Sequence, residues 1–193
     1  QFNGRSIETL RFGNGETLDL GSVRYTNNGT AQGDSLYGIS SGGGGDFLFG
    51  LGGNDRLYAG AGNDDLDGGA GNDTLYGGQG NDRYIGSAGL DIIADDGGID
   101  SIILADVAAG RVSMVRSGTD LIIRVDGNDA LVIDGQFSQR GQIETLVLAG
   151  GAVIDLLSRV YPVTGTSASN TLVGISYGGS PDDLISGLGG NDS

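Results

Sequence analysis

Aspartates recur along the first half of the chain at a spacing of nine residues. The series comprises Asp46, Asp55, Asp64, Asp73, Asp82, Asp91 and Asp100. A glycine precedes each aspartate by two positions and an apolar residue follows it by two, as in Gly71, Asp73 and Leu75. Carboxylates at a fixed spacing are suited to hard cations, which take oxygen ligands. The spacing therefore indicates a regular array of cation sites.

The composition narrows the choice of ion. The 193 residues include no cysteine and no histidine, so the nitrogen and sulfur ligands that zinc and copper prefer are missing. Ca²⁺ accepts six to eight oxygens, backbone carbonyls included, whereas Mg²⁺ prefers a small octahedral shell with retained waters. We therefore expect calcium.

The charge excludes other classes of function. Aspartate and glutamate number 25 against 10 lysines and arginines, a formal charge of −15, which excludes a basic nucleic-acid surface. No apolar run is long enough to span a membrane. We expect no catalysis, because no histidine or lysine is present to activate a nucleophile. The adjacent carboxylates Asp64 and Asp65 could serve glycosidase chemistry, but we expect Asp65 only to point outward.

The nine-residue unit predicts the elements that hold these aspartates. Its glycines permit a tight turn, and we expect the asparagine before the aspartate to tolerate a left-handed backbone. The next three residues form a short strand whose middle side chain points inward. Two turns and two strands make an 18-residue coil, with aspartates stacked along two edges. The fold class is therefore all-β, a right-handed parallel β-roll flanked by antiparallel hairpins that cap it.

A longer period divides the chain. The sequence at 7–10 recurs at 143–146, 136 positions later, and that at 50–55 recurs at 187–192. We expect a longer parent protein with further copies. The predicted divisions are the end of a preceding strand module, the roll, a strand module with two hairpins, and the start of a second, truncated roll, at residues 1–28, 29–105, 106–163 and 164–193. A disordered linker is the alternative, but it would not keep apolar residues in phase with aspartate.

The unit resembles a known family. Residues 68–76 and 77–85 are similar to the haemolysin-type calcium-binding repeats of RTX proteins, and 102–156 resembles the strand module that often follows them. The resemblance implies about five to six ions, each held by positions two, four and six of one turn and positions one, three and six of the turn 18 residues later. It also implies export through a type I secretion apparatus to the cell exterior or surface.

Carried onto this sequence, the family pattern gives five ligand sets. One edge would carry Leu51, Gly53 and Asp55 with Gly68, Ala70 and Asp73, then Gly69, Gly71 and Asp73 with Gly86, Ala88 and Asp91. The other would carry Gly42, Gly44 and Asp46 with Ala59, Ala61 and Asp64; Gly60, Gly62 and Asp64 with Gly77, Gln79 and Asp82; and Gly78, Gly80 and Asp82 with Asp95, Gly97 and Asp100. A sixth, irregular set would be Thr30, Gln32 and Asp34 with Gly50, Gly52 and Asp55. Asp183 and Asp192 would lack partner turns.

The function expected from these features is calcium-driven folding. Each unit buries about one apolar side chain, which stabilises less than the ordering of nine residues costs, so ion binding must supply the difference. The module would then serve as a scaffold in a secreted protein. The alternative is a module that binds polysaccharide or a cell surface through a stacked ladder of Tyr37, Tyr58 and Tyr76.

Overall fold

The chain is described by a computed structural model. The structure describes residues 9–19, 23–38, 44–138, 141–158, 161, 163–164 and 185–186. They are almost entirely β-structure, with single turns of 3₁₀ helix at Ala109–Arg111 and Ala149–Gly151. Among these residues no helix is long and apolar enough to cross a membrane. The predicted second roll at 164–193 lies outside the described residues, apart from Thr164 and a short strand, β18 (Ile185–Ser186), that pairs with β17 (Val163–Thr164).

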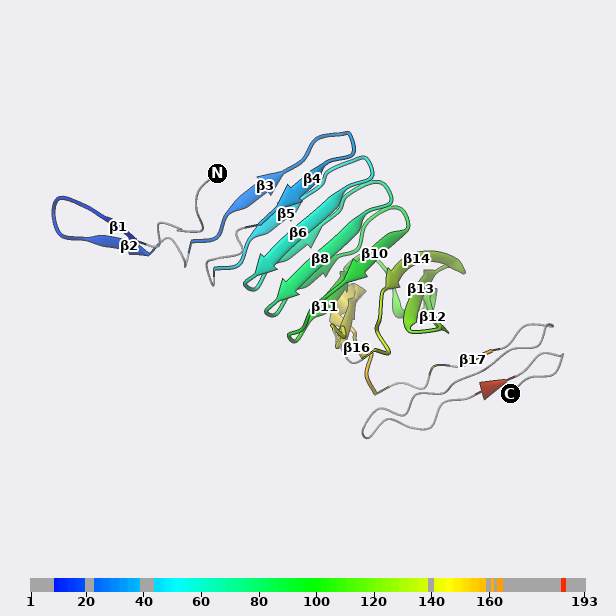
Figure 1. Cartoon of the computed structure of the whole chain (residues 1–193). Coiled ribbons are helices and arrows are strands. Elements are labelled where there is room, and N and C mark those ends of the chain that lie inside the picture. Colours follow the sequence, from blue (N-terminus) through cyan, green and yellow to red (C-terminus); the bar gives the residue numbers. More distant parts are fainter. Residues whose placement is uncertain are drawn as a thin grey trace.

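Two seven-stranded sheets form the body of the molecule (Figure 1). The first contains, in spatial order, β12 (Val112–Ser117), β13 (Asp120–Val125), β14 (Asn128–Ile133), β10 (Asp91–Ala94), β8 (Thr74–Gln79), β6 (Arg56–Ala61) and β4 (Ser35–Tyr37). The second contains β16 (Val153–Asp155), β15 (Thr145–Leu148), β11 (Ser101–Leu104), β9 (Arg83–Ile85), β7 (Asp65–Asp67), β5 (Phe47–Phe49) and β3 (Thr26–Asn28). Successive strands from β3 to β11 alternate between the sheets, so the chain winds as a parallel β-roll.

The interior is lined by the apolar side chains at the inward position predicted for each strand from β4 to β11. They are Leu36, Leu48, Leu57, Leu66, Leu75, Tyr84, Ile93 and Ile102, each at most 6% exposed. Neighbours in one sheet pair in register, as Leu57 does with Leu75. The inward position predicted from the nine-residue unit is therefore confirmed.

The strand module extends both sheets beyond the last coil. β14 pairs in parallel with β10, and β15 pairs in parallel with β11. The predicted hairpins are present, one turning at Asp126 and Gly127, which both have positive φ, and one joining β15 to β16. Leu121, Ile123, Leu131, Ile133, Leu146 and Leu148 continue the buried core. The module thus covers the end of the roll.

The start of the roll differs from the expected boundary. β3 (Thr26–Asn28) pairs in parallel with β5, so the roll begins inside the segment assigned to the preceding module. The predicted N-terminal hairpin is present as β1 (Thr9–Arg11) and β2 (Thr17–Asp19). It forms its own two-stranded sheet and stands apart from the first coil (Figure 1). Within the described residues it adds no strand to the roll.

Two strands of the roll are twice as long as the three residues expected. β6 and β8 each span six residues and continue through the first three turn positions, where Gly60 pairs with Gly78 and Ala61 with Gln79. The turns on this edge therefore stack closely enough to retain backbone pairing. Part of the expected ligand set is thereby placed at the ends of strands.

Candidate metal centre

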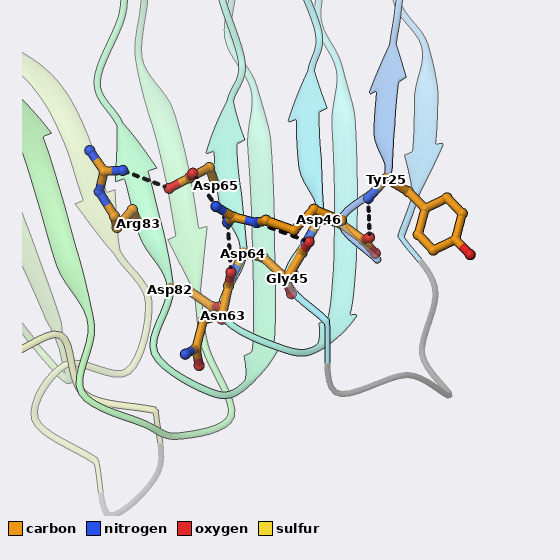
Figure 2. A network of polar contacts seen from close by, with 9 residues as sticks. Tyr25, Gly45, Asp46, Asn63, Asp64, Asp65, Asp82 and Arg83 are labelled. Atoms are coloured by element: carbon orange, nitrogen blue, oxygen red, sulfur yellow. Dashed lines mark hydrogen bonds and ion pairs between the residues drawn. The ribbon is translucent and has the colours of Figure 1, made fainter. Parts of the chain in front are cut away.

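The repeated aspartates form two hydrogen-bonded columns, one along each edge of the roll. On the first edge Asp55 N–H donates to Asp73 Oδ1 at 2.8 Å, and Asp73 N–H donates to Asp91 Oδ1 at 3.0 Å. The second edge repeats the bond from Asp46 to Asp64, from Asp64 to Asp82 and from Asp82 to Asp100, at 2.6 to 2.8 Å. Figure 2 shows Asp46, Asp64 and Asp82 along this edge. The predicted stacking of the aspartates along two edges of the roll is therefore confirmed.

One oxygen is left for another ligand in six of these carboxylates. All seven aspartates are at most 1% exposed. The buried Oδ2 atoms without a hydrogen-bond partner belong to Asp55, Asp64, Asp73, Asp82, Asp91 and Asp100. An ionised oxygen buried without a partner is strongly unfavourable. These oxygen donors fit a hard cation such as calcium.

Burial makes the charged columns costly without such a cation. Burial is the main reason why the pKa of Asp82 and Asp100 is raised to about 7 and that of Asp91 to about 6; the backbone hydrogen bond that each carboxylate accepts acts against this rise, and repulsion from neighbouring carboxylates adds to it. Burial is also the main reason why the pKa values of Asp64 and Asp73 are raised. Protons and calcium therefore compete for these oxygens, and acidification weakens calcium binding.

The invariant glycine at the fourth turn position has a steric cause. Gly71 has φ of 138°, and a Cβ on it would lie 1.6 Å from the backbone oxygen of Gly53, one coil earlier. A Cβ on Gly80, Gly89 or Gly98 would likewise lie 1.7 Å from the equivalent oxygen. A side chain here would push the turns apart and move the carbonyls expected to bind the ion.

The expected carbonyl ligands lie in these stacked turns. The carbonyl oxygen at the third position of a turn accepts a hydrogen bond from the backbone N–H at the fourth position of the turn one coil earlier. The Ala70 oxygen accepts the N–H of Gly53 at 2.8 Å, and the Ala88 oxygen accepts that of Gly71 at 2.9 Å. A carbonyl oxygen has two lone pairs, so one remains for an ion. Gly42 lies outside the described residues, as do Asp183 and Asp192. The ligand sets stay predictions.

The asparagines beside the aspartates differ from the expected role. The non-glycine residues with positive φ in the described part of the chain are Leu51 and Asp126, so no asparagine there adopts a left-handed backbone. Instead, Asn54 Oδ1 accepts the backbone N–H of Asn72 at 2.9 Å, and Asn63 accepts that of Asn81 at 2.8 Å. Asparagine is favoured here because its side-chain oxygen accepts a backbone hydrogen bond from the next coil.

Asp65 also differs from the expectation. Its side chain is only 7% exposed and is ion-paired with Arg24 at 3.3 Å. It is also ion-paired with Arg83 at 3.1 Å (Figure 2). Arg24 additionally donates to the carbonyl oxygens of Gly45 and Asn63 and lies over the ring of Phe47. This arginine therefore ties the first coils of the second edge together.

The two columns end differently, which the nine-residue period does not predict. On the second edge Asp100 N–H donates to Glu144 Oε2 at 2.6 Å, so Glu144 of the strand module takes the place of the next aspartate. On the first edge Asp91 lies beside the apolar Leu131. At the start, Asp34 N–H donates to Asp55 as in the columns, but its own Oδ2 accepts two bonds from Thr30. The recurrence of the Ile-Glu-Thr-Leu sequence was the signal that could have identified Glu144.

Glu144→Ala is expected to lower the free energy of unfolding by about 1–3 kcal/mol, because the buried Asp100 amide would lose its acceptor. Glu144→Gln keeps an acceptor oxygen and should lose much less. Urea unfolding at a fixed calcium concentration measures both. Equal losses in the two variants would contradict the hydrogen-bonding role.

Comparison with known protein families agrees with this geometry. The family of the RTX calcium-binding nonapeptide repeat matches in four copies, at residues 40–75, 63–93, 76–104 and 175–193. The haemolysin-type calcium binding protein related domain matches residues 120–156, which include β13 to β15. A search of curated proteins found no match.

The chain therefore belongs to the RTX family of haemolysin-type calcium-binding repeats. The matched copies at 40–104 contain the seven column aspartates, so the roll is a calcium-binding structural module. The further copy at 175–193 agrees with the predicted second block of repeats.

Proposed function

We propose that this chain is the calcium-dependent folding module of a large secreted protein and serves there as a structural scaffold. The observation that carries the proposal is the set of buried Oδ2 atoms without partners in two continuous columns. Groups of this kind favour the folded state only when a cation neutralises them. The proposed role is structural rather than catalytic, because the repeated carboxylates are all committed to these columns.

Calcium-dependent folding would also allow the chain to be exported from the cell. Type I secretion passes an unfolded chain, and this module would stay unfolded at the low free calcium of the cell interior. Extracellular calcium modules bind with dissociation constants of about 10⁻⁴–10⁻³ M. Folding would then begin outside the cell. Repeats of this family typically belong to secreted proteins, which supports the proposal.

A polysaccharide-binding role has less support. Tyr37, Tyr58 and Tyr76 do form the expected ladder, with ring centroids 5.2 and 4.7 Å apart and planes within 10°. The two faces of the Tyr58 ring are therefore covered by its neighbours and cannot stack on a sugar. The ladder instead stiffens the outer face of β4, β6 and β8.

Equilibrium dialysis against labelled calcium tests the proposal. We expect about five to six ions per chain at millimolar calcium, and little displacement by equimolar Mg²⁺, because the backbone carbonyls and bridging carboxylates suit a larger coordination shell. Five such ions would carry ten positive charges against the chain's −15. Binding of no calcium, or equal displacement by Mg²⁺, would refute the proposal.

A further inference from the structure

One position on the second edge has an additional carboxylate. Carboxylate oxygens of Asp82, Asp95 and Asp100 lie within 4.8 Å of one another, and this is the one such acidic cluster among the described residues. The family pattern assigns Asp95 only a backbone carbonyl, as the first residue of its turn. Its side chain, however, is directed into the space between two column aspartates.

The spacing of the cluster suits one calcium ion. Calcium–oxygen distances are about 2.3–2.6 Å, so two ligands on opposite sides of the ion are separated by roughly 5 Å. Asp82 and Asp100 are at most 1% exposed, and the Oδ2 atom of each has no hydrogen-bond partner. These oxygens without hydrogen-bond partners are an observation independent of the clustering, and they are suited to bind a cation.

Asp95 is held in place by Tyr84. The Tyr84 hydroxyl donates a short hydrogen bond to Asp95 Oδ2 and accepts the backbone N–H of Gly77 at 3.0 Å. The other oxygen, Asp95 Oδ1, accepts the N–H of Gly97 at 2.6 Å. Tyr84 is fully buried and occupies the inward position that is leucine or isoleucine in the other matching units. Unlike those apolar side chains, its hydroxyl forms hydrogen bonds with two turns, at Gly77 and at Asp95.

The strand module closes the same turn. Gly141 lies so near the backbone oxygen of Asp95 that a Cβ would come within 1.7 Å of it. Glu144, three residues after Gly141, accepts a hydrogen bond from the backbone N–H of Asp100. The turn at 95–100 is therefore fixed on one side by the previous coil and on the other by the module, and its carboxylates are held in place before an ion arrives.

We propose that Asp95 is a side-chain ligand of the calcium ion between Asp82 and Asp100, that Tyr84 positions it, and that this three-carboxylate site is the tightest site of the roll. The proposal rests on the proposed function, since it assumes calcium in the columns. Charge count and rigidity are the two properties that raise calcium affinity at oxygen sites. The equivalent turns elsewhere begin with Ala59, Gly68, Gly77 and Gly86 and supply no third carboxylate.

Terbium luminescence tests the site directly, because Tb³⁺ substitutes for calcium and is excited by a nearby tyrosine. We expect the first equivalent of Tb³⁺ to give sensitised emission in the unmodified chain. Asp95→Asn should require about 10- to 100-fold more free Tb³⁺ for the same emission. Asp96→Asn removes the same charge from the exposed neighbouring residue and should behave as the unmodified chain does.

The Tyr84→Phe variant tests whether the ion that gives this emission lies next to Tyr84. It should lose most of the first-equivalent emission, while equilibrium dialysis still finds the same number of calcium ions. Circular dichroism at saturating calcium checks that each variant folds. An unchanged Asp95→Asn titration, or undiminished emission in Tyr84→Phe, would overturn the assignment and leave the proposed function standing. Absence of Tb³⁺ and Ca²⁺ binding in the unmodified chain would overturn both.

Discussion

Removal of calcium is expected to abolish the β-roll. In excess chelator at pH 7.5 the chain should lose its β-sheet circular dichroism and expand, and millimolar calcium should restore both in one cooperative step. The reason lies in the columns, where six buried Oδ2 atoms have no partner and successive carboxylates of one column repel one another. With one apolar side chain per strand, the core is too small to offset that repulsion and the cost of ordering the turns.

Cooperativity follows from the way the sites are joined. In the predicted ligand sets each inner aspartate belongs to two successive sites, and each coil is hydrogen-bonded to the next, so an ion bound at one site would order ligands of its neighbour. We expect a midpoint of about 10⁻⁴–10⁻³ M calcium with a steep titration. Mg²⁺ at the same concentration is the control. A chain fully folded in chelator would contradict the calcium-driven account, as would a Mg²⁺ response equal to that of calcium.

The regular part of this structure could be predicted because stacking is a local property. A nine-residue spacing places every second aspartate above another, and the inward residue is fixed by strand alternation. Leu57, Leu75 and Ile93 are therefore buried where expected, and Asp55, Asp73 and Asp91 form one column. No knowledge of distant contacts is needed for either result.

The junctions could not be predicted in this way, because they join segments outside the period. Glu144 lies 44 residues beyond Asp100, and only the pairing of β15 with β11 brings it to the end of the column. Arg24 covers Asp65 from 41 residues away. Asp95 was visible in the sequence, but the inward Tyr84 that turns its carboxylate toward the ion position occupies an ordinary core position.

Substitution of a central column aspartate should have the largest effect of any single change. Asp73→Asn keeps the size of the side chain and an oxygen to accept the Asp55 amide, but it removes the charge from two successive sites. A site that binds calcium only in the folded state stabilises the fold by about 2.7 kcal/mol at a hundredfold excess over its dissociation constant. Loss of two sites should lower the free energy of unfolding by roughly 5 kcal/mol.

Asp91→Asn provides the graded comparison on the same edge. Asp91 is the last aspartate of its column, since Leu131 lies beside it, and therefore takes part in one site. Its loss should be about half that of Asp73→Asn, while Asp106→Asn, on an exposed turn outside the roll, should have little effect. Urea unfolding of the three variants at about 10 mM calcium measures the difference. Equal losses at Asp73 and Asp91 would mean that the carboxylates do not bridge successive ions, because only a shared ligand makes the inner position cost twice the outer one.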